Sequence, residues 1–170
     1  MMKLRLAALV AIVTVALSSG AQAQSSRVLS KHNDWEVRTY SDSSGKVCYA
    51  LSVPKQKLPG PPVDHGDVYF FVSTRPGQNV ANEPSMFVGY PFKTDSDLSV
   101  DVDGTSFSMF TKGDGAWVAN AAEEQRLVGA MKAGSRMTVK GVSQRGTNTS
   151  YSYSLSGITA ALDAVANACK

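Results

Sequence analysis

The sequence predicts a mainly β protein, an antiparallel β-sandwich-like domain of about nine short strands with two helices, the second of them C-terminal. Three observations support this fold class. Short apolar or alternating segments recur along the chain and are separated by Gly, Pro, Asn and Asp. Helical periodicity occurs in only two places, both in the last third. An Asp-Gly pair joins two alternating segments, which is typical of a β-hairpin.

The first 23 residues have the order of a signal peptide. Lys3 and Arg5 precede an apolar run from Leu6 to Leu17, and the triplet Ala21-Gln22-Ala23 matches a small-residue cleavage site. The run is shorter than the ~20 residues that a membrane-spanning helix needs. We therefore expect cleavage after Ala23. The mature protein is expected in the periplasm, with association with the outer envelope or secretion as further possibilities. No membrane contact is expected except through the cleaved segment.

The charge and length of the mature chain limit its class of partner and its number of domains. Without Lys3 and Arg5 its net charge is +1, and no basic stripe indicates a nucleic-acid partner. The remaining length fits one domain, which we place at residues 33–170 after a polar, flexible stretch at 24–32.

The first hairpin is predicted from alternation. Trp35 and Val37 lie on one side of a strand over Asp34–Tyr40, with Glu36 and Arg38 on the other. A turn around Gly45 leads to the return strand Val47–Val53.

A continuous apolar run from Val68 to Val72 predicts a central strand covered on both faces. It lies between two predicted surface loops, Pro54–Gly66 and Arg75–Pro84. The first loop is rich in proline, which lacks the donor that a central strand needs.

The second half of the chain contains both predicted helices. Asn120 can cap a helix over Ala121–Lys132, and Glu123 can complete its capping box. The final helix, Ile158–Ala168, has a narrow apolar stripe. The nine predicted strands are Asp34–Tyr40, Val47–Val53, Asp67–Thr74, Met86–Tyr90, Asp97–Val102, Thr105–Thr111, Ala116–Val118, Met137–Val142 and Ser150–Leu155.

The two cysteines, Cys48 and Cys169, are expected to form a disulfide, because an even count in an exported chain favours pairing. Two free thiols and a metal pair are the alternatives. A metal is disfavoured since only His32 and His65 could join the cysteines, and neither has ligand spacing. We expect no cofactor.

A search for catalytic residues finds little. His65 is expected to be a solvated loop residue, and the chain contains no G-x-S-x-G nucleophile motif. The acidic stretch before Gly104 lacks EF-hand spacing and is interpreted as a turn. Trp35 and Trp117 are expected in the core. Tyr151 and Tyr153, which share a strand face, are either an exposed binding strip or core residues.

Three further stretches occur in order along the chain. They are Asn33-Asp34-Trp35-Glu36-Val37, Gly89-Tyr90-Pro91-Phe92-Lys93, and Tyr153-Ser154-Leu155-Ser156-Gly157 followed by Ala160-Ala161-Leu162-Asp163 and the terminal cysteine. Together these stretches resemble the invasion-associated locus B family of bacteria, chiefly alphaproteobacteria. The resemblance covers essentially the whole mature chain. Better-known members usually carry extra cysteines, so the chain resembles a two-cysteine branch. The resemblance implies an exported periplasmic or envelope-associated β-protein, and it supplies no catalytic residues.

These observations favour a non-enzymatic envelope protein whose partners are envelope or host proteins. A hydrolase or other enzyme with a loop site near His65 is one alternative. A structural or stress-related protein without a specific ligand is another. The lack of a histidine–acid–nucleophile motif argues against the enzyme. The sequence does not separate the other two.

Overall fold

The computed structural model describes residues 26–170, so the predicted signal peptide lies outside the described residues. The described chain forms eleven strands, two α-helices and a short 3-10 helix, η1 (Pro76–Gln78). The strands are β1 (Arg27–His32), β2 (Trp35–Asp42), β3 (Gly45–Ser52), β4 (Gln56–Leu58), β5 (Tyr69–Arg75), β6 (Val80–Phe87), β7 (Asp97–Val102), β8 (Thr105–Lys112), β9 (Gly115–Trp117), β10 (Arg136–Val142) and β11 (Asn148–Ser154).

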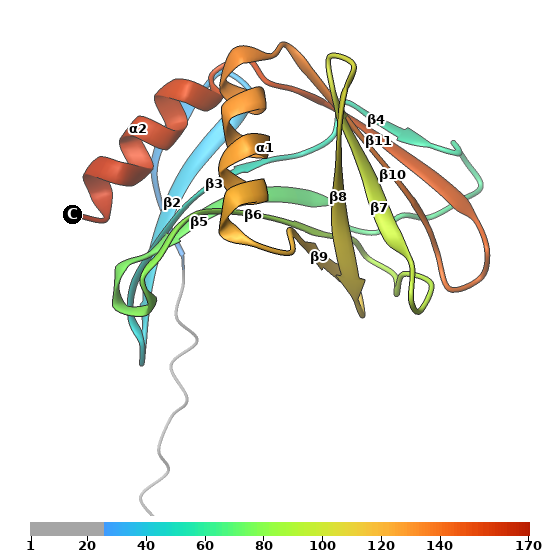
Figure 1. Ribbon diagram of the computed structural model, residues 1–170, viewed down its shortest axis with the longest axis horizontal. Helices are drawn as coiled ribbons and strands as arrows, with labels where there is room; N and C mark the ends of the chain where they lie inside the picture. Colours follow the sequence, from blue (N-terminus) through green and yellow to red (C-terminus); the bar gives the residue numbers. More distant parts are fainter. Residues whose placement is uncertain (1–25) are drawn as a thin grey trace, which may run out of the picture.

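All strands belong to one antiparallel sheet, in the order β1-β2-β3-β5-β6-β9-β8-β7-β10-β11-β4. The sheet curls, so that strands far apart in this order face each other (Figure 1). Trp35 on β2 donates a hydrogen bond from Nε1 to the carbonyl oxygen of Ser154 on β11, at 3.1 Å. The rings of Phe70 on β5 and Tyr153 on β11 lie 5.7 Å apart. The result is the sandwich-like arrangement that the sequence predicts.

The core lies inside this curl and is closed by the two helices. Helix α1 (Ala121–Ala133) packs mainly on β6, and helix α2 (Ile158–Ala168) packs on β1, β2 and β3. Their buried residues are those of the predicted apolar stripes, Leu127, Val128 and Met131 on α1 and Ile158, Ala161, Leu162 and Val165 on α2. The Asn120 side chain accepts a hydrogen bond from the Glu123 N–H, which confirms the predicted helix cap. The carboxylate of Glu123 binds Arg126 and not the Asn120 N–H, so the predicted capping box is not completed.

Residues 27–32, which belong to the stretch expected to be flexible, are ordered as a strand. Arg27–His32 forms β1, which pairs with β2 at the edge of the sheet. Main-chain hydrogen bonds to β2 order this segment although it buries no apolar face. Composition alone could not show these bonds, because they depend on the neighbouring strand.

The prediction of loops is corrected at two further places. β4 forms within the proline-rich segment, but it is short, exposed and at the sheet edge, where proline is tolerated. β6 begins at Val80 and not at Met86, and it includes Pro84. Pairing with β9 starts only at Ser85, so Pro84 lies where that side of β6 has no strand neighbour.

Both helices of residues 26–170 are too short or too polar to cross a membrane.

Candidate functional site

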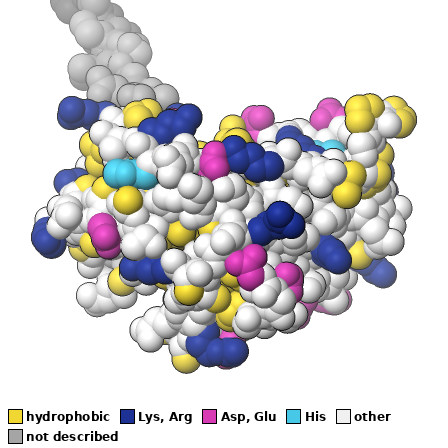
Figure 2. All heavy atoms as spheres, turned by 90° about the horizontal axis from the view of Figure 1, so that it is seen from above, with side chains coloured by type: hydrophobic (Ala, Val, Ile, Leu, Met, Phe, Trp, Pro, Cys, Tyr) yellow, Lys and Arg dark blue, Asp and Glu magenta, His cyan; other side chains and the backbone are white. Residues whose placement is uncertain are grey.

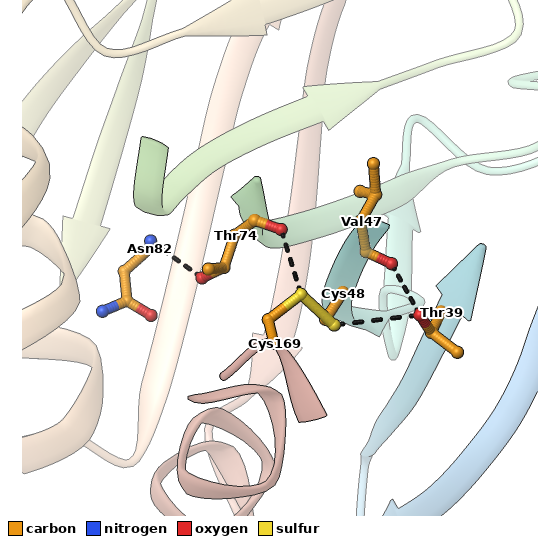
Figure 3. Close-up of a disulfide and its surroundings, with 6 residues drawn as sticks. All are labelled: Thr39, Val47, Cys48, Thr74, Asn82 and Cys169. Carbon is orange, nitrogen blue, oxygen red and sulfur yellow. Dashed lines mark hydrogen bonds between the residues drawn. A yellow bond between two sulfur atoms is a disulfide. The ribbon is translucent and has the colours of Figure 1, made fainter. Parts of the chain in front are cut away.

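The disulfide joins the end of the last helix to strand β3 (Figure 3). Cys48 is fully buried on β3, Cys169 follows α2, and their Cα atoms are 5.9 Å apart. Around the bond, Thr39 Oγ1 lies 3.8 Å from the sulfur of Cys48, and the sulfur of Cys169 lies 3.7 Å from the carbonyl oxygen of Thr74. The predicted pairing is therefore present, and it fixes α2 to the inner face of the sheet.

A row of aromatic side chains follows the opposite, outer face of the sheet. It arises from strand register, because Tyr69 lies opposite Phe87 and Phe110 lies opposite Trp117 on neighbouring strands. Neighbouring ring centroids are 5.4–6.1 Å apart, a distance at which tilted and edge-to-face pairs attract. The members of this outer aromatic row are Tyr40, Tyr49, Tyr69, Phe71, Phe87, Phe110 and Trp117.

The outer aromatic row is not part of the core. Phe110 is 44% exposed, the other members are half-buried, and none belongs to the core cluster that contains the buried residues of both helices. Two predictions are corrected here. Trp117 is not a core residue, and the central strand β5 is covered by the chain on only one face, with Tyr69 and Phe71 on the other.

A shallow groove of about 290 Å³ lies along the row. Besides the rings of Tyr49 and Trp117, it is lined by polar side chains that include Arg75 and Glu83. These two form an ion pair between β5 and β6, and Arg75 Nε also donates to Gln78 at 3.0 Å. The groove therefore combines aromatic surface with a fixed pair of opposite charges.

His65 is buried and not solvated as expected, with 5% of its surface exposed. Its Nε2 lies 2.8 Å from the carbonyl oxygen of Pro59, and its Nδ1 lies 2.8 Å from the hydroxyl of Tyr151. A carbonyl can only accept, so Nε2 carries a proton and donates it to Pro59. Both ring nitrogens are thus used in holding the loop to β11.

Tyr151 connects His65 to a chain of buried hydroxyls. The hydroxyl of Tyr90 lies 2.6 Å from that of Tyr151 and 2.8 Å from Oγ1 of Thr149. Burial raises the pKa of Tyr151, and the hydrogen bond with Tyr90 raises it further. Tyr151 and Tyr153 are both core residues, so the alternative of an exposed binding strip is wrong.

A larger open cavity, of about 770 Å³, lies beside this hydroxyl chain. Three separate segments form it, namely the loop around Val63, the segment Gly89–Pro91 after β6, and the turn between β10 and β11. The lining residues are Pro62, Val63, Asp64, Gly89, Tyr90, Pro91, Ser143, Gln144, Arg145, Thr147 and Thr149.

Charge and metal-binding groups show no concentrated site in the described chain. On the face that Figure 2 shows, Lys and Arg side chains are interspersed with Asp and Glu. Within residues 26–170, no three His, Cys, Asp or Glu side chains lie close enough together to hold a metal ion. His32 lies on β1, where its Nε2 is 2.9 Å from Oγ of Ser30.

Comparison with known proteins identifies a family and a fold. Residues 35–166 match the family described as Invasion associated locus B (IalB) protein. The crystal structure of invasion associated protein b from Bartonella henselae is similar, with a TM-score of 0.55 and 12% sequence identity over 83% of this chain and 96% of that chain. At this identity the likeness concerns the fold. A comparison with curated protein sequences finds no match.

Proposed function

This chain belongs to the invasion associated locus B family, and we propose from that premise that it is an exported, non-enzymatic protein of the bacterial envelope. Its proposed role is to bind a protein partner, in the envelope or at a host surface, through the outer aromatic row. The observation that carries this proposal is that the aromatic side chains of the row stay partly exposed and lie outside the core formed by residues 26–170.

Export is supported by two features. Residues 1–23 have the three parts of a signal peptide. The bond between Cys48 and Cys169 belongs to an oxidising compartment such as the periplasm, because cytoplasmic reductants keep most thiols reduced. Mass spectrometry of the periplasmic protein should show Gln24 as its first residue. An intact Met1 in that fraction would contradict export by cleavage.

The chemistry of the row supports a protein as the partner. Tyr, Trp, Phe and Arg are enriched in the centres of protein–protein interfaces, and truncating Trp, Tyr or Arg there most often causes a large loss of affinity. The groove along the row is shallow and contains Arg75 paired with Glu83, which offers opposite charges for matching polar groups of a partner.

A non-enzymatic role is supported by the burial and the hydrogen bonds of His65. General base catalysis needs a ring nitrogen that can reach a substrate proton. In this protein one nitrogen faces Pro59, the other faces Tyr151, and the ring is buried. His65→Ala should therefore leave any activity of the purified protein within about tenfold, whereas losing a general base costs ~100-fold or more.

Site-specific photo-cross-linking in intact cells tests the proposed partner surface. A photoreactive phenylalanine at position 110 is compared with one at position 28, since Phe110 and Val28 are 44% and 49% exposed and lie on different parts of the sheet. We expect a discrete cross-linked protein from position 110 only.

The controls are two serine variants. The cross-link from position 110 should disappear with Trp117→Ser and survive Val28→Ser. The identified partner should bind the purified protein with the same dependence on Trp117. Equal cross-linking from both positions, none from either, or insensitivity to Trp117→Ser would contradict the proposal.

A further inference from the structure

We propose that the 770 Å³ cavity between the Val63 loop, the Gly89–Pro91 segment and the β10–β11 turn is a binding site for a neutral saccharide. Its volume lies within the range of about 300–1,000 Å³ that is usual for small-molecule sites in proteins. The proposal is independent of the outer aromatic row, since the cavity and the row share no residue.

The walls of the cavity are held together by main-chain hydrogen bonds. Gly89 N–H donates to the carbonyl of His65 at 3.0 Å, which joins the loop to the segment after β6. Gln144 N–H donates to the carbonyl of Pro91 at 2.9 Å, which joins that segment to the β10–β11 turn. The three segments therefore form one connected frame around the cavity.

Two glycines allow the loop and the segment to come this close. A Cβ atom at Gly89 would lie 2.6 Å from the Cα atom of Gly66, and one at Gly66 would lie 2.8 Å from the Cα atom of Gly89. Any larger residue at either position would push the two walls apart. The shape of the cavity thus depends on a contact that only glycine permits.

The ring of Tyr90, in the wall of the cavity, is fixed from behind. Its hydroxyl is held by Tyr151 and Thr149, and His65 in turn holds Tyr151. A buried network with its hydrogen bonds formed keeps the ring in one orientation before a ligand arrives. Such pre-organisation lowers the entropic cost of binding.

The lining matches the two kinds of surface that a pyranose ring offers. The prolines, Val63 and the ring of Tyr90 supply apolar surface for the C–H faces of a sugar. Asp64, Gln144 and Arg145 have planar ends, and their paired donors or acceptors can bond two adjacent hydroxyls. One carboxylate and one guanidinium cancel in charge, which favours a neutral ligand over a phosphate or an acidic chain.

Asp64 and Arg145 offer variants that keep the fold. Oδ1 of Asp64 accepts a hydrogen bond from Gly66 N–H at 2.8 Å, and the amide oxygen of Asp64→Asn can accept the same bond. Arg145 is exposed and forms no ion pair within residues 26–170, so Arg145→Gln removes no structural contact of that kind. Arg27→Gln and Asp163→Asn are matched controls, because both residues are exposed and lie outside the cavity.

The test is calorimetric titration of the oxidised mature protein with maltose, cellobiose, N,N′-diacetylchitobiose and inorganic phosphate. We expect saturable binding of at least one disaccharide, about tenfold or more weaker in Asp64→Asn and Arg145→Gln and unchanged in the two controls. Binding of phosphate alone, binding of no disaccharide, or disaccharide binding that both cavity variants retain would overturn the proposal.

Discussion

Tyr151 and Tyr153 lie two residues apart on the same face of β11 and are equally buried, yet only the hydroxyl of Tyr151 has hydrogen-bond partners. The hydroxyl of Tyr153 has no partner among residues 26–170, and its ring packs against Phe70. Burial raises the pKa of both phenols, because a buried phenolate would lose its hydration. The two residues therefore provide an internal comparison of a bonded and an unbonded buried hydroxyl.

Removing the hydroxyl of Tyr151 should destabilise the protein, whereas removing that of Tyr153 should not. Tyr151→Phe leaves His65 Nδ1 and the Tyr90 hydroxyl without their partner, so the free energy of unfolding should fall by about 1–3 kcal/mol. Tyr153→Phe removes a buried group that has no bond, so the same quantity should stay constant or rise by about 1 kcal/mol. Urea unfolding of both variants gives the comparison, and a larger loss in Tyr153→Phe would show that the assignment of partners is wrong.

Alkaline pH should destabilise the protein through the same two tyrosines. Their pKa values are raised in the fold, so the unfolded chain loses these protons first as pH rises. The stability they contribute is complete below the pKa of about 10 of an unfolded tyrosine, and it is lost as pH rises above that value. The melting temperature should fall less between pH 9 and 11 in the Tyr151→Phe, Tyr153→Phe double variant than in the wild type. Tyr40→Phe, on the half-buried outer row, serves as the control.

Both helices, and the strands in which apolar and polar residues alternate, were predictable because each depends on residues close together in the sequence. Asn120 and Glu123 lie three residues apart and form the expected cap, and the apolar stripes of the helices face the core. The disulfide was predictable for a different reason, since two cysteines in an exported chain allow one intramolecular pairing.

The candidate sites were not predictable because they depend on contacts distant in sequence. Alternation shows that Phe71 shares a face with Tyr69, but not that the other face of β5 packs into the core beneath α2. His65 looks like a loop residue until its partner Tyr151, 86 positions later, is placed beside it. The sequence did contain one indication of the outer aromatic row, namely that β5 has apolar residues on both of its faces. We interpreted this pattern as a strand with two buried faces.

Two glycine substitutions should change stability in opposite directions. Gly89→Ala would place a Cβ atom 2.6 Å from the backbone of Gly66, so it should lower the free energy of unfolding by at least about 1 kcal/mol. Gly129 lies inside α1 with no atom near the position of a new Cβ, so Gly129→Ala should raise the same quantity by about 1 kcal/mol. Thermal melts of the two variants check this, and a neutral Gly89→Ala would mean that the Val63 loop can move away from the segment after β6.

The bond between Cys48 and Cys169 should stabilise the protein more than any other single interaction. It spans 121 positions, and for a loop of that length the chain-entropy model gives roughly 4–5 kcal/mol. Helix α2 is short, so it depends on its packing against the sheet, and the bond holds its end in place. At about 2–4 °C per kcal/mol, Cys169→Ser should lower the melting temperature by roughly 10 °C or more. Reducing the wild type should have the same effect, whereas the Cys48→Ala, Cys169→Ala double variant should not respond to reductant. A wild-type melt that is unchanged after complete reduction, with free thiols verified by mass, would show that packing alone secures the helix.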